Sequence, residues 1–119
     1  MLALEEIIVD THDDYTPWAA CVVGFNDDGD FVVRYNLMDY DHRERSYTRD
    51  AVIKKDNALE VAQFLKVHLV KLPAHLEKKF GQPLDSSTAG EVKMVFDDIL
   101  NYISANKGDY QLHRLPYQE

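Results

Sequence analysis

Hydrophobic positions follow strand-like spacing in the first half of the chain and helix-like spacing in the second. Apolar runs at residues 3–9 and 18–25 have the length of strands, and residues 31–37 alternate between apolar and polar positions. Asp28 and Gly29, between the second and third runs, predict a hairpin turn because Gly accepts the positive φ that tight turns need. A shorter fourth strand is expected around residues 45–49.

From about residue 56 the apolar spacing is that of a helix. Asn57 and Glu60 predict a capping box at its start, and Pro73 is expected to kink or restart the helix near Lys71. Gly81 should end it. The apolar positions of this segment are Ala58, Val61, Ala62, Leu65, Leu69, Leu72 and Leu76.

A second helix is expected from Thr88, with Glu91 completing a capping box. Its apolar stripe consists of Val92, Val95, Phe96, Ile99 and Ile103. Residues 106–108 should stop it, and residues 110–115 are a last strand or an extended tail. Strands followed by helices predict a single α+β domain over residues 1–119. We expect an antiparallel sheet of three to five strands, mostly from the N-terminal half, with two helices packed on one face.

Composition is that of a chain able to bury its own core. With 119 residues and 45% hydrophobic residues, it should fold without a disulfide or a structural metal, and the single Cys21 has no intrachain partner. The first residues lack the basic region of a signal peptide, and no apolar run is long enough for a membrane span. We therefore expect a cytoplasmic protein that associates with no membrane.

The net charge of −8 lies entirely in the first part of the chain. Residues 1–50 contain twelve acidic residues and four Arg, whereas the remaining residues are balanced and contain every Lys. A sequence pI near 5.0 disfavours nucleic acid as a partner, because phosphate binding depends on Lys and Arg. The segregation instead indicates an acidic surface for a basic protein.

Few residues are candidates for chemistry. Aligning Gly29 with the glycine of an EF-hand loop puts Gly24 and Tyr35 at ligand positions, so the acidic turn does not predict a calcium site. Cys21 lies in an apolar run, where a thiol is usually inert. We find no nucleophile elbow, phosphate-binding glycine loop or HExxH motif, and predict neither enzymatic activity nor a cofactor.

Two His and carboxylate clusters support an alternative. A metal-dependent or acid/base enzyme could draw on both clusters if they converge in one pocket, although neither has a recognised ligand spacing. Ordinary solvated loops are the other interpretation. The residues concerned are His12, Asp14, Asp39, Asp41 and His42.

Three acidic loops contain or adjoin aromatic residues: 12–18, 26–30 and 38–44. Tyr and Trp are common interface anchors, and nearby acids steer a basic partner and bind its Arg and Lys side chains. A simple strand meander would place the first and third loops at one end of the sheet and the second at the other. The predicted partner-binding residues are Asp13, Asp14, Tyr15, Trp18, Asp27, Asp28, Asp30, Asp39, Tyr40, Asp41 and Glu44.

In size, charge distribution and element order the chain resembles the immunity proteins with which bacteria neutralise their own contact-delivered or polymorphic toxins. This resemblance implies a tight one-to-one complex with a basic toxin domain, often a nuclease, blocked at or beside its active site. The free protein would be a monomer or a small homo-oligomer. A further alternative is a subunit of a homo-oligomeric assembly, joined through an uncovered sheet edge.

Overall fold

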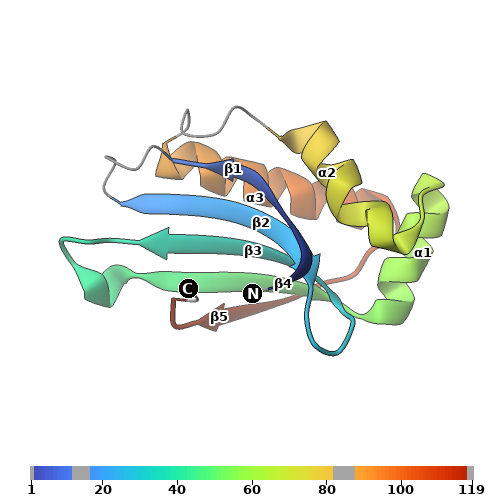
Figure 1. Cartoon of the computed structure of the whole chain (residues 1–119), viewed down its shortest axis with the longest axis horizontal. Helices are drawn as coiled ribbons and strands as arrows, with labels where there is room; N and C mark the ends of the chain where they lie inside the picture. The colour runs from blue at the N-terminus through green and yellow to red at the C-terminus, as the bar shows by residue number, and fades with distance from the viewer. Residues whose placement is uncertain (1, 12–16, 82–87, 118–119) are drawn as a thin grey trace.

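A computed structural model of the chain describes residues 2–11, 17–81 and 88–117. Within these ranges, five strands form one antiparallel sheet in the order β1-β2-β3-β4-β5 (Figure 1). The strands are β1 (Ala3–Asp10), β2 (Trp18–Phe25), β3 (Phe31–Met38), β4 (Tyr47–Ile53) and β5 (Gln111–Leu115). The α-helices are α1 (Lys55–Leu65), α2 (Leu72–Phe80) and α3 (Ala89–Ala105), with short 3-10 helices η1 (Arg43–Arg45) and η2 (Leu69–Lys71). The predicted α+β class is confirmed.

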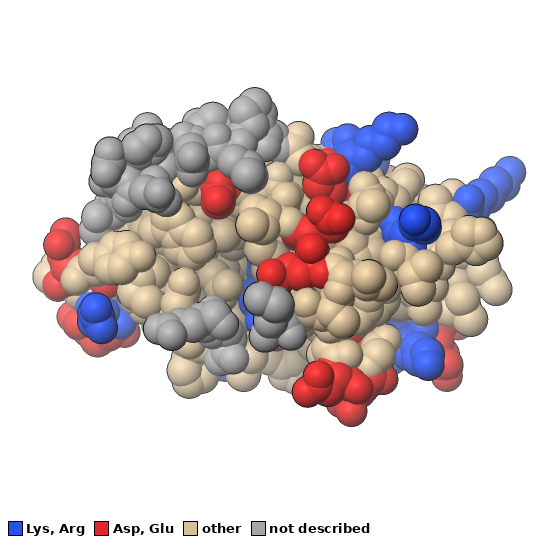
Figure 2. All heavy atoms as spheres, viewed as in Figure 1, with Lys and Arg blue, Asp and Glu red and all other residues tan. Residues whose placement is uncertain are grey.

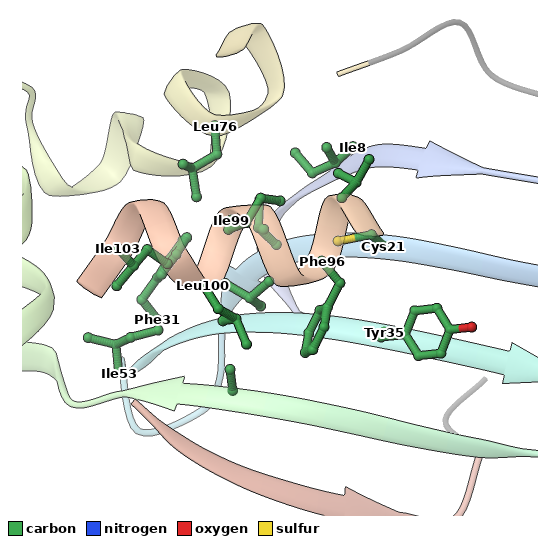
Figure 3. Packing of buried hydrophobic residues seen from close by; sticks show 14 of the residues in the cluster. Ile8, Cys21, Phe31, Tyr35, Ile53, Leu76, Phe96, Ile99, Leu100 and Ile103 are labelled. Atoms are coloured by element: carbon green, nitrogen blue, oxygen red, sulfur yellow. The ribbon is translucent and has the colours of Figure 1, made fainter. Parts of the chain in front are cut away.

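Helices cover one face of the sheet, and none of the described helices lies on the other face (Figure 1). α3 packs on β2 and β3, while α2 packs beside β1. Figure 3 shows Phe96, Ile99, Leu100 and Ile103 of α3 pointing towards the strands. All five positions of the predicted α3 stripe are buried, and the Thr88–Glu91 capping box is present.

The predicted first helix is divided in two. Lys66 adopts the left-handed conformation with φ 62°, and its backbone N–H bonds to the carbonyls of Ala62 and Gln63, which ends α1. The chain resumes as η2 and then α2, in which Pro73 lies in the first turn, where its missing N–H costs nothing. Three α-helices therefore occupy the described residues where two were expected.

The predicted Asn57 capping box is wrong. α1 begins earlier, at Lys55, whose backbone N–H donates to Asp30 Oδ1 at 2.9 Å. The Asn57 side chain instead donates to the Lys107 carbonyl at 3.0 Å and accepts from the Asp109 N–H at 2.6 Å. Asn57 thus fastens α1 to the connection between α3 and β5.

The fourth strand is longer than expected and starts later. η1 occupies residues 43–45, and β4 continues to Ile53 beyond the predicted end at 49. Arg49 and Asp50 interrupt the apolar pattern on the sequence, but Asp50 is buried in an ion pair with Arg34 of β3. The ion pair compensates the buried charge of Asp50, so β4 can continue past this residue.

β1 is irregular where it crosses the end of β2. Its pairing with β2 contains two register shifts, and Leu4 has a φ of 52°. A Cβ added to Gly24 would lie 2.7 Å from the Leu2 Cβ and 2.9 Å from the Ala3 carbonyl oxygen. The absence of a side chain at Gly24 is what allows this close approach.

Candidate partner-binding surface

In the antiparallel meander, the β2–β3 turn and the β3–β4 connection lie at opposite ends of the sheet (Figure 1). Trp18 pairs with Met38, so the connections β1–β2 and β3–β4 lie at the same end. Phe25 pairs with Phe31, which places the β2–β3 turn at the opposite end. Among the predicted binding residues that the structure describes, those of 26–30 therefore lie at the end of the sheet opposite to Trp18 and those of 38–44.

At the first end, the β3–β4 connection is built around Asp39. The Asp39 carboxylate accepts from the backbone N–H groups of Asp41, at 3.1 Å, and His42, at 3.0 Å. Ser46 Oγ accepts from the Asp39 N–H at 2.9 Å and donates to Met38 Sδ at 3.2 Å. Asp39 is only 9% exposed, so it shapes the loop and presents little of its carboxylate to a partner.

The rest of this loop faces solvent. Tyr40 is 56% exposed, and Asp41 and Glu44 are exposed beside it. His42 Nδ1 lies 3.7 Å from Glu44 Oε1. Trp18, at the adjacent start of β2, is half-buried. The other candidate residues of this end, His12, Asp13, Asp14 and Tyr15, lie outside the described residues.

At the opposite end, the β2–β3 turn is tied to itself and to α1. Asn26 Oδ1 accepts from the N–H groups of Asp28 and Asp30, each at 3.0 Å, and Gly29 has a φ of 81°. Asp30 is 7% exposed, because it caps α1 and lies 3.7 Å from Lys54 Nζ. Only Asp27 and Asp28 present exposed carboxylates here.

Acidic side chains are consequently scattered over the helix-free face in separate groups. Figure 2 shows one column running over β1, a second group at the β2–β3 turn and a third over the β3–β4 connection. Blue basic side chains adjoin the third group, where η1 contributes Arg43 and Arg45. The exposed charge at this end is therefore mixed.

Sequence reasoning missed the ion pair between Arg34 and Asp50 on the helix-free face. Arg34 Nε lies 2.8 Å from Asp50 Oδ1 and Nη2 lies 3.0 Å from Oδ2, with side chains 13% and 8% exposed. The hydrogen bond to Asp50 raises the pKa of Arg34, and the charge of Glu5 adds to this. Beside the pair, Thr48 donates to the Asn36 side chain. Asp50 lies one residue beyond the predicted end of the fourth strand, so its pairing with Arg34 could not be predicted without the true extent of β4 and its register with β3.

Two buried groups are held in their neutral forms. Burial raises the pKa of the Cys21 thiol, which removes it from consideration as a nucleophile at neutral pH. Burial, with Tyr47, Cys21 and Asp97 nearby, raises the pKa of Tyr35 to about 12. Both side chains belong to the core shown in Figure 3.

Among the described residues, no group of three or more His, Cys, Asp or Glu is arranged to hold a metal ion. Asp39, one member of the proposed His and carboxylate site, uses its carboxylate on backbone N–H groups instead. Nor does any described helix combine the length and the apolarity needed to cross a bilayer. Comparison with protein families, curated proteins and solved structures finds no match.

Proposed function

We propose that this protein is an inhibitor of the immunity type, which binds a basic bacterial toxin domain one-to-one and blocks its activity. The observation that supports this most is Tyr40, 56% exposed between two carboxylates on a loop with a defined internal structure. Exposed aromatic side chains of this kind often contribute much of the binding free energy at protein interfaces. The protein would act in the cytoplasm.

Preorganisation of the loop favours tight binding. The Asp39 carboxylate and the Ser46 hydroxyl together hold three backbone N–H groups, at distances of 2.9 to 3.1 Å. A loop already held in one conformation loses little entropy when a partner binds, so more of the contact energy appears as affinity. Asp39 therefore acts as a positioning residue for Tyr40.

The net charge of the molecule would attract a basic partner over a longer range than the contacts of this loop. Asp41 and Glu44 are balanced locally by Arg43 and Arg45. The net charge of −8, which residues 1–50 carry, would raise the association rate with a basic domain. If the partner is a nuclease, the carboxylates would occupy the field intended for substrate phosphates, and Tyr40 and Trp18 would supply apolar contact.

Isothermal titration against the protein encoded by the adjacent reading frame tests this proposal. We expect binding at low salt that weakens as added salt screens the charges. Tyr40→Ala should weaken it about tenfold or more. Phe64→Ala, which removes another half-exposed ring from α1 at the opposite end, should leave it unchanged. Absence of binding at low salt would contradict the proposal.

A pair of charge-matched variants separates local contact from long-range attraction. Asp41→Asn and Asp28→Asn change the net charge equally but lie at opposite ends of the sheet. We expect both to slow association slightly, and only Asp41→Asn to speed dissociation. Equal dissociation rates would mean that this loop is not the contact surface.

A further inference from the structure

The two edges of the sheet differ in how they are protected. β1 has two register shifts and a residue with positive φ, and α2 packs beside it. Such irregularities and covering elements are the usual means by which proteins prevent an edge from pairing with another chain. β5 pairs with β4 without any register shift over its whole length, and contains no Pro.

The outer edge of β5 is accessible. In Figure 1 it is the last strand of the sheet, and no described element lies beyond it. Gln111, Leu112, His113 and Arg114 are all exposed, Leu112 at 50%. Leu112 lies on the helix side of the sheet, opposite the buried Ala51, in an area that α3 leaves open because it packs on β2 and β3.

We propose that β5 pairs antiparallel with β5 of a second copy, around a two-fold axis at Leu112. Leu112 then packs against Leu112 of the second copy. Gln111 lies opposite His113, and Tyr110 opposite Arg114, so each pair brings together an amide and an imidazole or an aromatic ring and a guanidinium. The alternative centre at His113 would place two imidazoles face to face.

Charge at this edge is no barrier to a second copy, because Arg114 is its one formal charge and lies opposite Tyr110 in the proposed register. The segment QLHRL contains no acidic residue, so the carboxylates that give each copy its charge of −8 stay outside the pairing. Arg114 Cζ already lies 4.3 Å from the Tyr47 ring centroid, which holds the guanidinium on the helix side of the sheet. The pairing thus brings together the least acidic edges of two acidic molecules.

Sedimentation equilibrium of the full chain, from micromolar to near-millimolar concentration, tests the proposal. The expected result is a monomer–dimer equilibrium that strengthens with salt, because screening reduces the repulsion between two copies of charge −8. Binding to a basic toxin domain would show the opposite salt dependence, so the two proposals fail independently. A monomer at every concentration and salt level would overturn this one.

Matched variants locate the interface. Leu112→Lys would place two ammonium groups together on the axis and should weaken self-association at least tenfold, with circular dichroism unchanged. Leu4→Lys, the same change at an exposed residue of β1, should leave self-association as in the unaltered protein. Equal weakening of self-association in both variants, or weakening in Leu4→Lys alone, would overturn the assignment to β5.

Crosslinking tests the register. Leu112→Cys would bring two thiols within disulfide distance across the axis, and oxidised glutathione should join them by accepting their electrons and protons. Arg114→Cys would separate the thiols by roughly 13 Å along the strand. Cys21 is buried and stays out of the reaction. Efficient crosslinking at 114 without crosslinking at 112 would contradict the proposed pairing.

Discussion

Arg34 and Asp50 show how much one side chain can depend on another. With side chains 13% and 8% exposed, neither charge can be fully hydrated if its partner is removed. Arg34→Met should therefore lower the free energy of unfolding by about 3 to 5 kcal/mol, measured by urea denaturation, because a carboxylate stays buried without its cation.

Two controls accompany this variant. The double variant Arg34→Met with Asp50→Leu should recover much of the loss, since no charge is then buried. Lys93→Met breaks the Lys93–Asp97 pair on α3, whose side chains are 37% and 52% exposed, and should cost about 0.5 kcal/mol or less. A cost for Lys93→Met equal to that for Arg34→Met would contradict the role of burial.

Tyr35 links stability to alkaline pH. Its pKa rises from 10.0 to about 12, mainly through burial, so the folded protein holds this proton more tightly than the unfolded chain. The resulting stability is complete below pH 10.0 and is lost as the pH rises towards about 12. The melting temperature should therefore fall less steeply across this pH range in Tyr35→Phe than in the unaltered protein. The exposed Tyr40→Phe should retain the original profile, and equal slopes for both variants would refute this assignment.

At the scale of elements, the β2–β3 turn controls where α1 begins. Asp30 reaches across from this turn to the Lys55 N–H at 2.9 Å. Asp30→Ala should destabilise the protein by about 1 kcal/mol in urea denaturation, as loss of an N-terminal cap does. Asp28→Ala removes an exposed carboxylate from the same turn and should have little effect. Similar losses for the two would exclude a capping role for Asp30.

Glycine positions at two elements should respond oppositely to the same change. In Gly24→Ala the new Cβ would meet the Ala3 carbonyl oxygen at 2.9 Å, so β1 must shift, at a cost of about 1 to 3 kcal/mol. In Gly90→Ala, near the start of α3, the nearest atom is Thr88 Oγ1 at 3.9 Å. That variant should gain up to about 1 kcal/mol through helix propensity. Opposite shifts in melting temperature are expected, and shifts of the same sign would contradict this explanation.

Elements with strong local signals were predictable. Val33 and Tyr35 alternate with the polar residues Arg34 and Asn36, and Thr88 with Glu91 forms a local motif, so periodicity and capping were sufficient there. The end of α1 at Lys66 was not predictable in this way, because neither Gly nor Pro marks it. The extension of β4 depended on Arg34, a partner sixteen residues away.

Predicting the candidate surface was harder for the same reason. Composition identified the acidic loops, but Asp30 and Asp39 turn inward to backbone N–H groups. Tyr40 and Asp41 stay outside. Which carboxylate caps a helix and which meets solvent depends on the packing of distant segments. The sequence pattern therefore identifies the loop but not which of its residues are exposed.

At the scale of the whole molecule, salt distinguishes the two proposed associations. A complex with a basic domain is weakened by screening, whereas pairing of two copies through β5 is strengthened. Light scattering of the isolated protein and titration with its partner, each followed through a salt series, should therefore change in opposite directions. A common direction would mean that charge does not govern one of the two associations.

The strand order also has a consequence for synthesis on the ribosome. β1 to β4 are neighbours both in sequence and in the sheet, so they can pair while the chain is still being made. β5 joins β4 only after α3 has been completed, because residues 89–105 precede it. Until then β4 is the edge of the nascent sheet. In a chain stalled before residue 111, β4 should therefore be an unpaired edge that a chaperone must bind to prevent aggregation. In the finished protein β5 pairs with this edge, and the chaperone is no longer required.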